Sequence, residues 1–129
     1  MPDGANSTAK LFAGLPRIAP LEPAAASESF LLKDGFELQL IAAEPLVNDP
    51  IAAAFDESGN LYVADALNER VIQFPNGTAP GVVMTDGAGS TLGRVSRPEG
   101  VTVTQFTAGP LAGQPMLVVG DTMNNRIQG

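Results

Sequence analysis

Two stretches of the sequence decide the fold: residues 60–74 read NLYVADALNERVIQF, and residues 115–128 read PMLVVGDTMNNRIQ. In each stretch an apolar run ends in Asp, and a short polar turn leads into a second run. A set of three polar residues recurs at one constant offset: Asp65, Asn68 and Arg70, then Asp121, Asn124 and Arg126. A motif that returns together with its surroundings indicates an internal structural repeat.

Short segments of β-strand character surround both copies of the motif. The first unit predicts strands at 51–55, 61–65, 70–74 and 81–85, separated by turns rich in Asp, Asn, Gly and Pro. The second unit predicts strands at 98–103, 116–121 and 126–128, and Gly129 is reached before a fourth. Four antiparallel strands joined by short turns form a meander.

A repeat of four strands is typical of a β-propeller blade. We therefore expect an all-β fold, a partial β-propeller of about two four-stranded antiparallel blades, the second incomplete. Blade 1 covers about 50–85 and blade 2 about 98–129, within a domain that spans 30–129. The repeat is longer than a usual blade, and we assign the excess to two Gly-rich insertions, 86–93 and 107–114.

The region before the repeats is of a different character. Residues 1–29 are rich in Pro, Ala and Ser and predict an extended, partly disordered arm, in which 24–29 can form a helical turn. From Phe36, apolar Leu38 and Leu40 alternate with Glu37 and Gln39, which predicts a half-buried strand over 36–42. Such a strand is well placed to complete another blade as its outer strand.

Composition excludes several function classes. The chain has 129 residues, a formal net charge of -7, 44% hydrophobic residues, no Cys and no His. Disulfides, thiolate catalysis, Ser–His catalysis and covalent c-type haem attachment are thereby excluded. Seven scattered cations cannot form a basic nucleic-acid-binding face. No apolar run reaches the length of a membrane span, and the sequence as written predicts no signal peptide.

The repeated Asp-x-x-Asn-x-Arg pattern resembles the NHL repeat family, and the resemblance covers both units. A narrower resemblance runs over residues 16–65, where Gly35-Phe36, Ala43-Glu44-Pro45-Leu46-Val47, Asp49-Pro50 and Phe55-Asp56-Glu57 follow one another. This order is similar to the opening of the membrane-bound dehydrogenase family of planctomycete-type bacteria. Those proteins are propellers similar to quinoprotein sugar dehydrogenases such as sorbosone dehydrogenase.

The second resemblance implies an exported or periplasmic bacterial oxidoreductase with pyrroloquinoline quinone (PQQ) as a cofactor. This chain lacks the His that such dehydrogenases use as a base, and its own residues predict neither a cofactor site nor a metal site. The catalytic residues are unknown. The first hypothesis is an incomplete propeller that corresponds to the N-terminal blades of such a dehydrogenase and is inactive alone. The alternative is an NHL-type binding module with its partner on the propeller face.

The repeated Asp and Arg have two interpretations. They form a structural ion pair once per blade, or they form a rim contact for a ligand or RNA; a residue repeated in every blade favours the structural interpretation. Asn68 and Asn124 are expected in the turns. The expected partners are the remaining blades of the propeller or a second copy of the chain, in which strand 36–42 completes the second blade.

Three further segments offer candidate sites, and each also has a plainer interpretation. The turn 56–60 offers oxygen ligands to Ca²⁺, although hairpin turns often have this composition. The segment 86–94 invites a phosphate-loop interpretation, but its glycine spacing does not match the dinucleotide pattern, and a connector is the plainer explanation. Glu44 is a candidate catalytic carboxylate without an evident partner, and its plainer role is to fix a bend into the first blade.

Overall fold

The computed structural model describes residues 18–129 and divides the chain into two compact units, 1–38 and 39–129. The predicted arm of residues 1–29 lies outside the described residues as far as residue 17. In its described part the short helix α2 (Pro23–Glu28) forms, with Pro23 in its first turn. This position suits Pro because its fixed φ is compatible with the first turn and no hydrogen bond is lost there.

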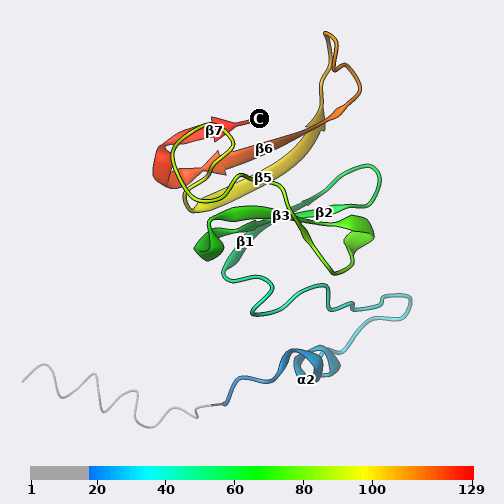
Figure 1. Cartoon of the computed structure of the whole chain (residues 1–129). Helices are drawn as coiled ribbons and strands as arrows, with labels where there is room; N and C mark the ends of the chain where they lie inside the picture. The colour runs from blue at the N-terminus through cyan, green and yellow to red at the C-terminus, as the bar shows by residue number, and fades with distance from the viewer. Residues whose placement is uncertain (1–17) are drawn as a thin grey trace, which may run out of the picture. The chain divides into compact units, whose positions relative to one another are not determined.

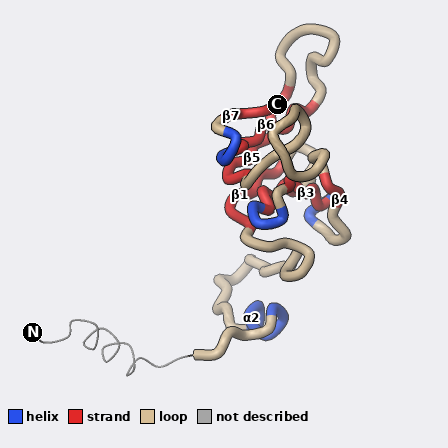
Figure 2. The backbone as a smooth tube through the Cα atoms, turned by 60° about the vertical axis from the view of Figure 1, so that its left-hand side comes forward, coloured by secondary structure: helices blue, strands red, loops and turns tan. Residues whose placement is uncertain are grey.

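Two antiparallel sheets make up the second unit (Figure 1). The first sheet has the order β1 (Pro50–Phe55), β2 (Leu61–Asp65), β3 (Arg70–Phe74) and β4 (Val82–Val83). The second has the order β5 (Pro98–Gln105), β6 (Pro115–Asp121) and β7 (Arg126–Gln128). The regular structure of the described residues is thus mostly β, as the sequence predicts, and loops and three short 3₁₀ turns connect the strands (Figure 2).

The two sheets repeat the same local geometry. Pro50 pairs with Asp65 and Pro98 with Asp121, and in both sheets the register shifts just after the proline. The residue before each proline, Asp49 or Arg97, has a positive φ. A 3₁₀ turn follows each Asp and ends at Glu69 or Asn125 in the left-handed conformation. The sequence repeat is therefore a structural repeat down to its backbone irregularities.

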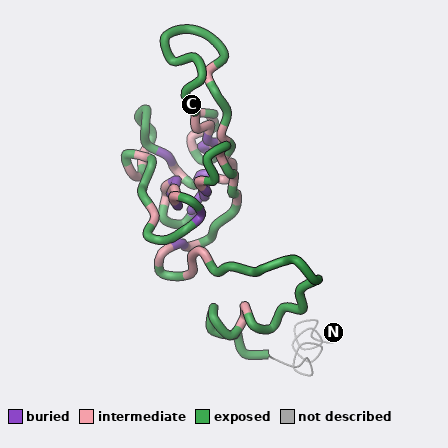
Figure 3. Tube along the Cα trace, turned by 90° about the vertical axis from the view of Figure 1, so that its right-hand side faces the viewer, coloured by how far each residue is buried: buried purple, intermediate pink, exposed green. Residues whose placement is uncertain are grey.

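The two faces of the first sheet pack against different parts of the chain, and each face is named here by one of its residues. The Val63 face packs against the segment 41–47 through Leu61, Val63, Ile72 and Phe74. The opposite Tyr62 face, with Tyr62 and Val71, packs against the second sheet. Most buried residues accordingly lie along β2, β3 and the contacts between the sheets (Figure 3).

The second sheet meets the first with the face that carries Val101, Val103, Leu117 and Val119, here named the Val119 face. Val119 is the repeat equivalent of Val63, and Val118 is the equivalent of Tyr62. The contact therefore joins the Tyr62 face of one repeat to the Val63-type face of the next. Such a contact between two different faces is heterologous and can propagate from repeat to repeat. The Val118 face of the second sheet carries Ile127, which is 77% exposed.

The prediction of a strand over 36–42 is wrong. This segment forms no strand, and Phe36, Leu38 and Leu40 are all exposed. Alternation is a local signal, whereas a strand needs a hydrogen-bonding partner, and none pairs with this segment among the described residues. The fourth predicted strand, 81–85, is shorter than expected because only Val82 and Val83 pair with β3.

No helix within residues 18–129 has both the length and the apolar character needed to cross a membrane.

The core below the Val63 face depends on Phe74, which is completely buried. We predict that Phe74→Ala lowers the free energy of unfolding by about 3–5 kcal/mol, because it removes a large apolar side chain and leaves a cavity. Phe55→Ala is the matched control, since this ring is largely exposed and should cost little. Urea unfolding followed by circular dichroism measures both, and equal losses would contradict the assignment of the core.

Candidate functional site

The repeated polar residues meet in one cluster per sheet. In the first, Asp65 at the end of β2 accepts hydrogen bonds from Asn68 Nδ2 and Arg70 Nε, both at 2.8 Å. Its other oxygen accepts from the backbone N–H of Asn48 at 2.6 Å. Arg70 also donates through Nη2 to the carbonyl oxygen of Leu46 at 2.7 Å. The cluster thus ties the segment that leads into β1 to the turn between β2 and β3.

The second cluster repeats these contacts. Asp121 accepts from the backbone N–H of Ser96 and from Arg126 Nε, both at 2.7 Å, and from Asn124 Nδ2. Arg126 donates to the carbonyl oxygen of Arg94 at 2.9 Å, as Arg70 does to that of Leu46. Gln128 Nε2 adds a bond to Asp121 at 2.9 Å that the first cluster lacks. We call these two clusters the Asp–Arg staples.

The burial of the two Asp side chains affects the protonation of the staples. Asp65 and Asp121 are fully buried, and about a quarter of each Arg side chain remains exposed. Burial is the strongest single influence on Asp121 and raises its pKa. The bonds from Ser96, Asn124 and Arg126 together outweigh burial, so the pKa of Asp121 lies below 3.8. The carboxylate is therefore held in its charged form.

These contacts leave little free bonding capacity for a substrate. Within residues 18–129 no buried side-chain nitrogen or oxygen lacks a hydrogen-bond partner. The carboxylate oxygens accept from the backbone, the Asn and the Arg of their own repeat. Because every donor belongs to the same sheet or its lead-in segment, the geometry of a staple is that of a structural ion pair.

The Gly-rich segment 86–94 belongs to the second staple. Arg126 donates to the carbonyl oxygens of Ser90 and Thr91 at 2.6 and 2.9 Å, and Asn124 donates to that of Gly89 at 2.8 Å. A phosphate loop presents its backbone N–H groups to the anion. Here the loop turns carbonyl oxygens toward a guanidinium instead, so its observed contacts are those of a connector.

In the acidic turn 56–60, the Asp56 carboxylate accepts hydrogen bonds from residues of the turn itself and from Tyr62. Asp56 accepts from the backbone N–H groups of Ser58 and Asn60 and from the side chains of Asn60 and Tyr62. The Asn60 amide, the strongest influence, lowers the pKa of Asp56. No group of three or more acidic side chains that could hold a metal occurs in the described part of the chain. Glu44, which the sequence suggests as a catalytic carboxylate, is exposed and lies in the turn before Val47.

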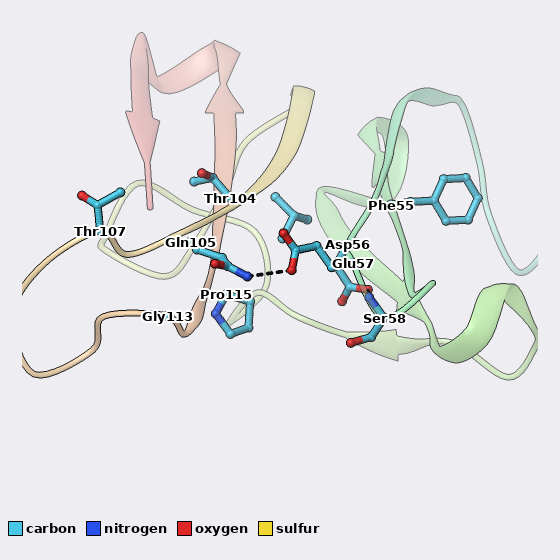
Figure 4. Close-up of a pocket in the computed structure, with 10 residues that line it drawn as sticks. Phe55, Asp56, Glu57, Ser58, Thr104, Gln105, Thr107, Gly113 and Pro115 are labelled. Atoms are coloured by element: carbon cyan, nitrogen blue, oxygen red, sulfur yellow. Dashed lines mark hydrogen bonds between the residues drawn. The ribbon is translucent and has the colours of Figure 1, made fainter.

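A surface hollow of about 480 Å³ lies between this turn and the β5–β6 hairpin. The hairpin is longer than its counterpart in the first sheet and projects beyond it (Figure 1). Across the hollow Gln105 Nε2 donates to Glu57 at 2.9 Å, while the ring of Phe55 points away from this pair (Figure 4). Sequence reasoning missed Glu57 and Gln105 as partners because they belong to different repeats.

Neither the hollow beside Gln105 nor a second one beside Val119 has a lining whose charge suits PQQ. PQQ carries three carboxylates, and the hollow beside Gln105 contributes the acidic side chains of Asp56 and Glu57 with no Lys or Arg. A second hollow of about 310 Å³, beside Val119 and Gln128, is lined by no charged side chain. Neither offers the cations that a tricarboxylate requires.

Comparison with known proteins gives one family. The profile of a family described as a domain of unknown function (DUF7133) matches residues 22–100, more than half of the chain. The comparison with curated proteins gives no match.

The second staple should make stability depend on pH. Since folding lowers the pKa of Asp121, its contribution is complete above the unfolded-state pKa of about 3.9 and is lost as the pH falls through the folded-state value. Asp121→Asn should flatten that acid limb and lower the free energy of unfolding at pH 7 by about 3 kcal/mol, because Arg126 loses its charged partner.

Urea unfolding between pH 7 and pH 2.5 measures both effects. Arg126→Lys is the matched variant: it keeps the positive charge but cannot reproduce the fork of bonds to Asp121 and the carbonyl oxygens. It should lose stability at pH 7. A wild-type acid limb in Asp121→Asn would show that this carboxylate does not contribute to the pH dependence.

Proposed function

The chain belongs to the family described as a domain of unknown function (DUF7133), and we propose that its two stapled sheets are consecutive blades of a β-propeller that serves as a scaffold. One observation carries the proposal: the Tyr62 face of the first sheet packs on the Val119 face of the second. A contact of this kind, repeated from one sheet to the next, closes into a ring when the rotation between successive repeats divides a full turn, and the proposal is that it does so.

The resemblance to quinoprotein-like dehydrogenases fits this role as a part of a larger ring. We propose that residues 39–129 correspond to the N-terminal blades of such a propeller and contribute structure rather than reacting groups. The repeated Asp and Arg side chains are engaged in the staples. The partners that complete the ring are further blades, and the Val118 face is the surface on which the next blade would pack.

A second candidate function is a binding module of the NHL type. The hollow beside Glu57 and Gln105 favours it, because this surface is built from the end of one sheet and the projecting hairpin of the other. Its lining is acidic, so a neutral or cationic ligand suits it better than an anion does.

A double-mutant cycle tests the contact on which the blade proposal rests. Val71 and Val119 belong to the cluster between the sheets, so Val71→Ala and Val119→Ala should show a coupling of about 0.5 kcal/mol or more in urea unfolding. Val63→Ala with Val119→Ala is the control pair, since Val63 lies on the opposite face, and its effects should add. Additive effects for Val71 and Val119 would remove the stacking contact and the blade proposal with it.

Enzyme assays test the scaffold role directly. The full chain, supplied with PQQ, Ca²⁺, an artificial electron-accepting dye and a panel of sugars and alcohols, should reduce the dye no faster than PQQ alone. Titration followed by PQQ absorbance should show no saturable binding. Protein-dependent dye reduction would overturn the proposal and favour an enzyme.

A further inference from the structure

The hollow beside Gln105, of about 480 Å³, lies between hairpin ends of the two neighbouring sheets. One wall is the turn 56–58, which joins β1 to β2, and the other is formed by residues 103–107 and 113–115 of the β5–β6 hairpin. In both hairpins the two strands pair along their length. The walls of the hollow therefore belong to regular sheet structure within the chain.

The lining of this hollow combines three kinds of side chain. Val103 and Pro115 contribute apolar surface, Thr104 and Gln105 contribute neutral polar groups, and Glu57 contributes a charge. Gln105 Nε2 donates to Glu57 Oε2 at 2.9 Å, and among residues 18–129 the Glu57 carboxylate accepts no other hydrogen bond (Figure 4). Its second oxygen is thus available to a ligand, because an ionised carboxylate accepts through both oxygens.

A second carboxylate at the hollow is held in its charged form. Asp56 accepts two hydrogen bonds from backbone N–H groups of its turn and two from the side chains of Asn60 and Tyr62. The bond from the Asn60 amide is the main cause of the lowered pKa of Asp56. Because its own bonding capacity is used within the turn, Asp56 adds negative charge to the hollow without offering a free acceptor.

The cations of residues 39–129 lie away from this hollow. These residues include four Arg and no Lys, and none of the Arg lines the hollow. Arg70 and Arg126 belong to the staples, at the opposite end of the sheets from the hairpins. Arg97 pairs with a neighbouring glutamate, and Arg94 bonds within the Gly-rich segment. A cationic ligand would therefore meet two carboxylates that no cation of this unit neutralises.

We propose that this hollow binds an aliphatic ammonium or guanidinium, with the charged head at Glu57 and the alkyl chain against Val103 and Pro115. The head would donate to the free carboxylate oxygen, and the alkyl chain would displace water from the apolar part of the wall. The inference rests on the second candidate function, a binding module, and narrows its ligand to this chemical class.

Titration of the full chain with cadaverine, a linear alkyl diamine, tests the inference. Tyr62 provides the signal, because it is the only Tyr in a chain without Trp and its hydroxyl donates to Asp56 at 3.2 Å. Cadaverine should change the fluorescence of Tyr62 saturably, and its binding should weaken as the ionic strength rises. Pentanediol, which has the same alkyl chain and no charge, is the matched control probe and should give no saturable change.

Variants locate the binding on the hollow. Glu57→Gln keeps the size of the side chain but removes its charge, and should weaken cadaverine binding by about tenfold or more. Thr104→Lys places an ammonium of the chain itself in the lining and should abolish the binding. Glu69→Gln is the matched control, since it removes a carboxylate in the turn after Asp65, at the stapled end. It should bind cadaverine as the wild type does.

A further probe distinguishes two sources of the same cation. An acetylated Gly-Lys-Gly peptide amide carries an alkyl ammonium on a protein backbone. Tighter binding of cadaverine than of the peptide would support the inference with a free amine as the ligand. Tighter binding of the peptide would support it with a Lys side chain of a protein as the ligand. In both cases Glu57→Gln should weaken the binding.

Three results would overturn the inference: no saturable binding of cadaverine or the peptide, equally tight binding of pentanediol, or an unchanged affinity in Glu57→Gln. If pentanediol saturates the signal and cadaverine does not, the hollow is a site for neutral ligands. The second candidate function would then stand while this inference fails. The double-mutant cycle between Val71 and Val119 reports on the blade proposal separately.

Discussion

The structure of residues 39–129 depends on two buried carboxylates. Asp65 and Asp121 are removed from water at the ends of β2 and β6, where an unpaired charge would cost several kcal/mol. Each is instead bound by an Arg, an Asn and one backbone N–H of the segment that leads into its sheet. A single side chain therefore fixes where the chain enters a sheet, where its second strand ends and how the next turn is shaped.

This constraint explains why the candidate residues are better suited to structure than to chemistry. A reacting carboxylate needs a free oxygen that a substrate can reach, whereas the oxygens of Asp65 and Asp121 are buried and hydrogen-bonded within their own repeats. The Arg side chains neutralise them and donate further hydrogen bonds to carbonyl oxygens of the lead-in segments. One surface that remains open is the hollow between the projecting hairpin and the turn at Glu57, whose lining residues belong to neither staple.

Local patterns predicted what local interactions determine. The strands at 61–65 and 70–74 and the pairing of Asp65 with Arg70 follow from alternation, turn residues and a spacing of five. The strand expected over 36–42 did not follow, because alternation cannot supply a partner. The contacts of Arg126 with residues 90–94 escaped prediction for a different reason: a backbone carbonyl has no signature in the sequence. The role of Ser96 as a donor to Asp121 is hidden in the same way.

The staples occupy only one end of each sheet, and this asymmetry has a consequence for the hairpins at the other end. Pro50 and Pro98 pair at the stapled end, whereas the hairpins that join the first two strands turn at the other end. A longer hairpin there leaves the contacts of Asp65 and Asp121 in place, and the second repeat already carries one. A change in hairpin length at that end therefore leaves both Asp–Arg staples intact, and loops of different length can be accommodated there.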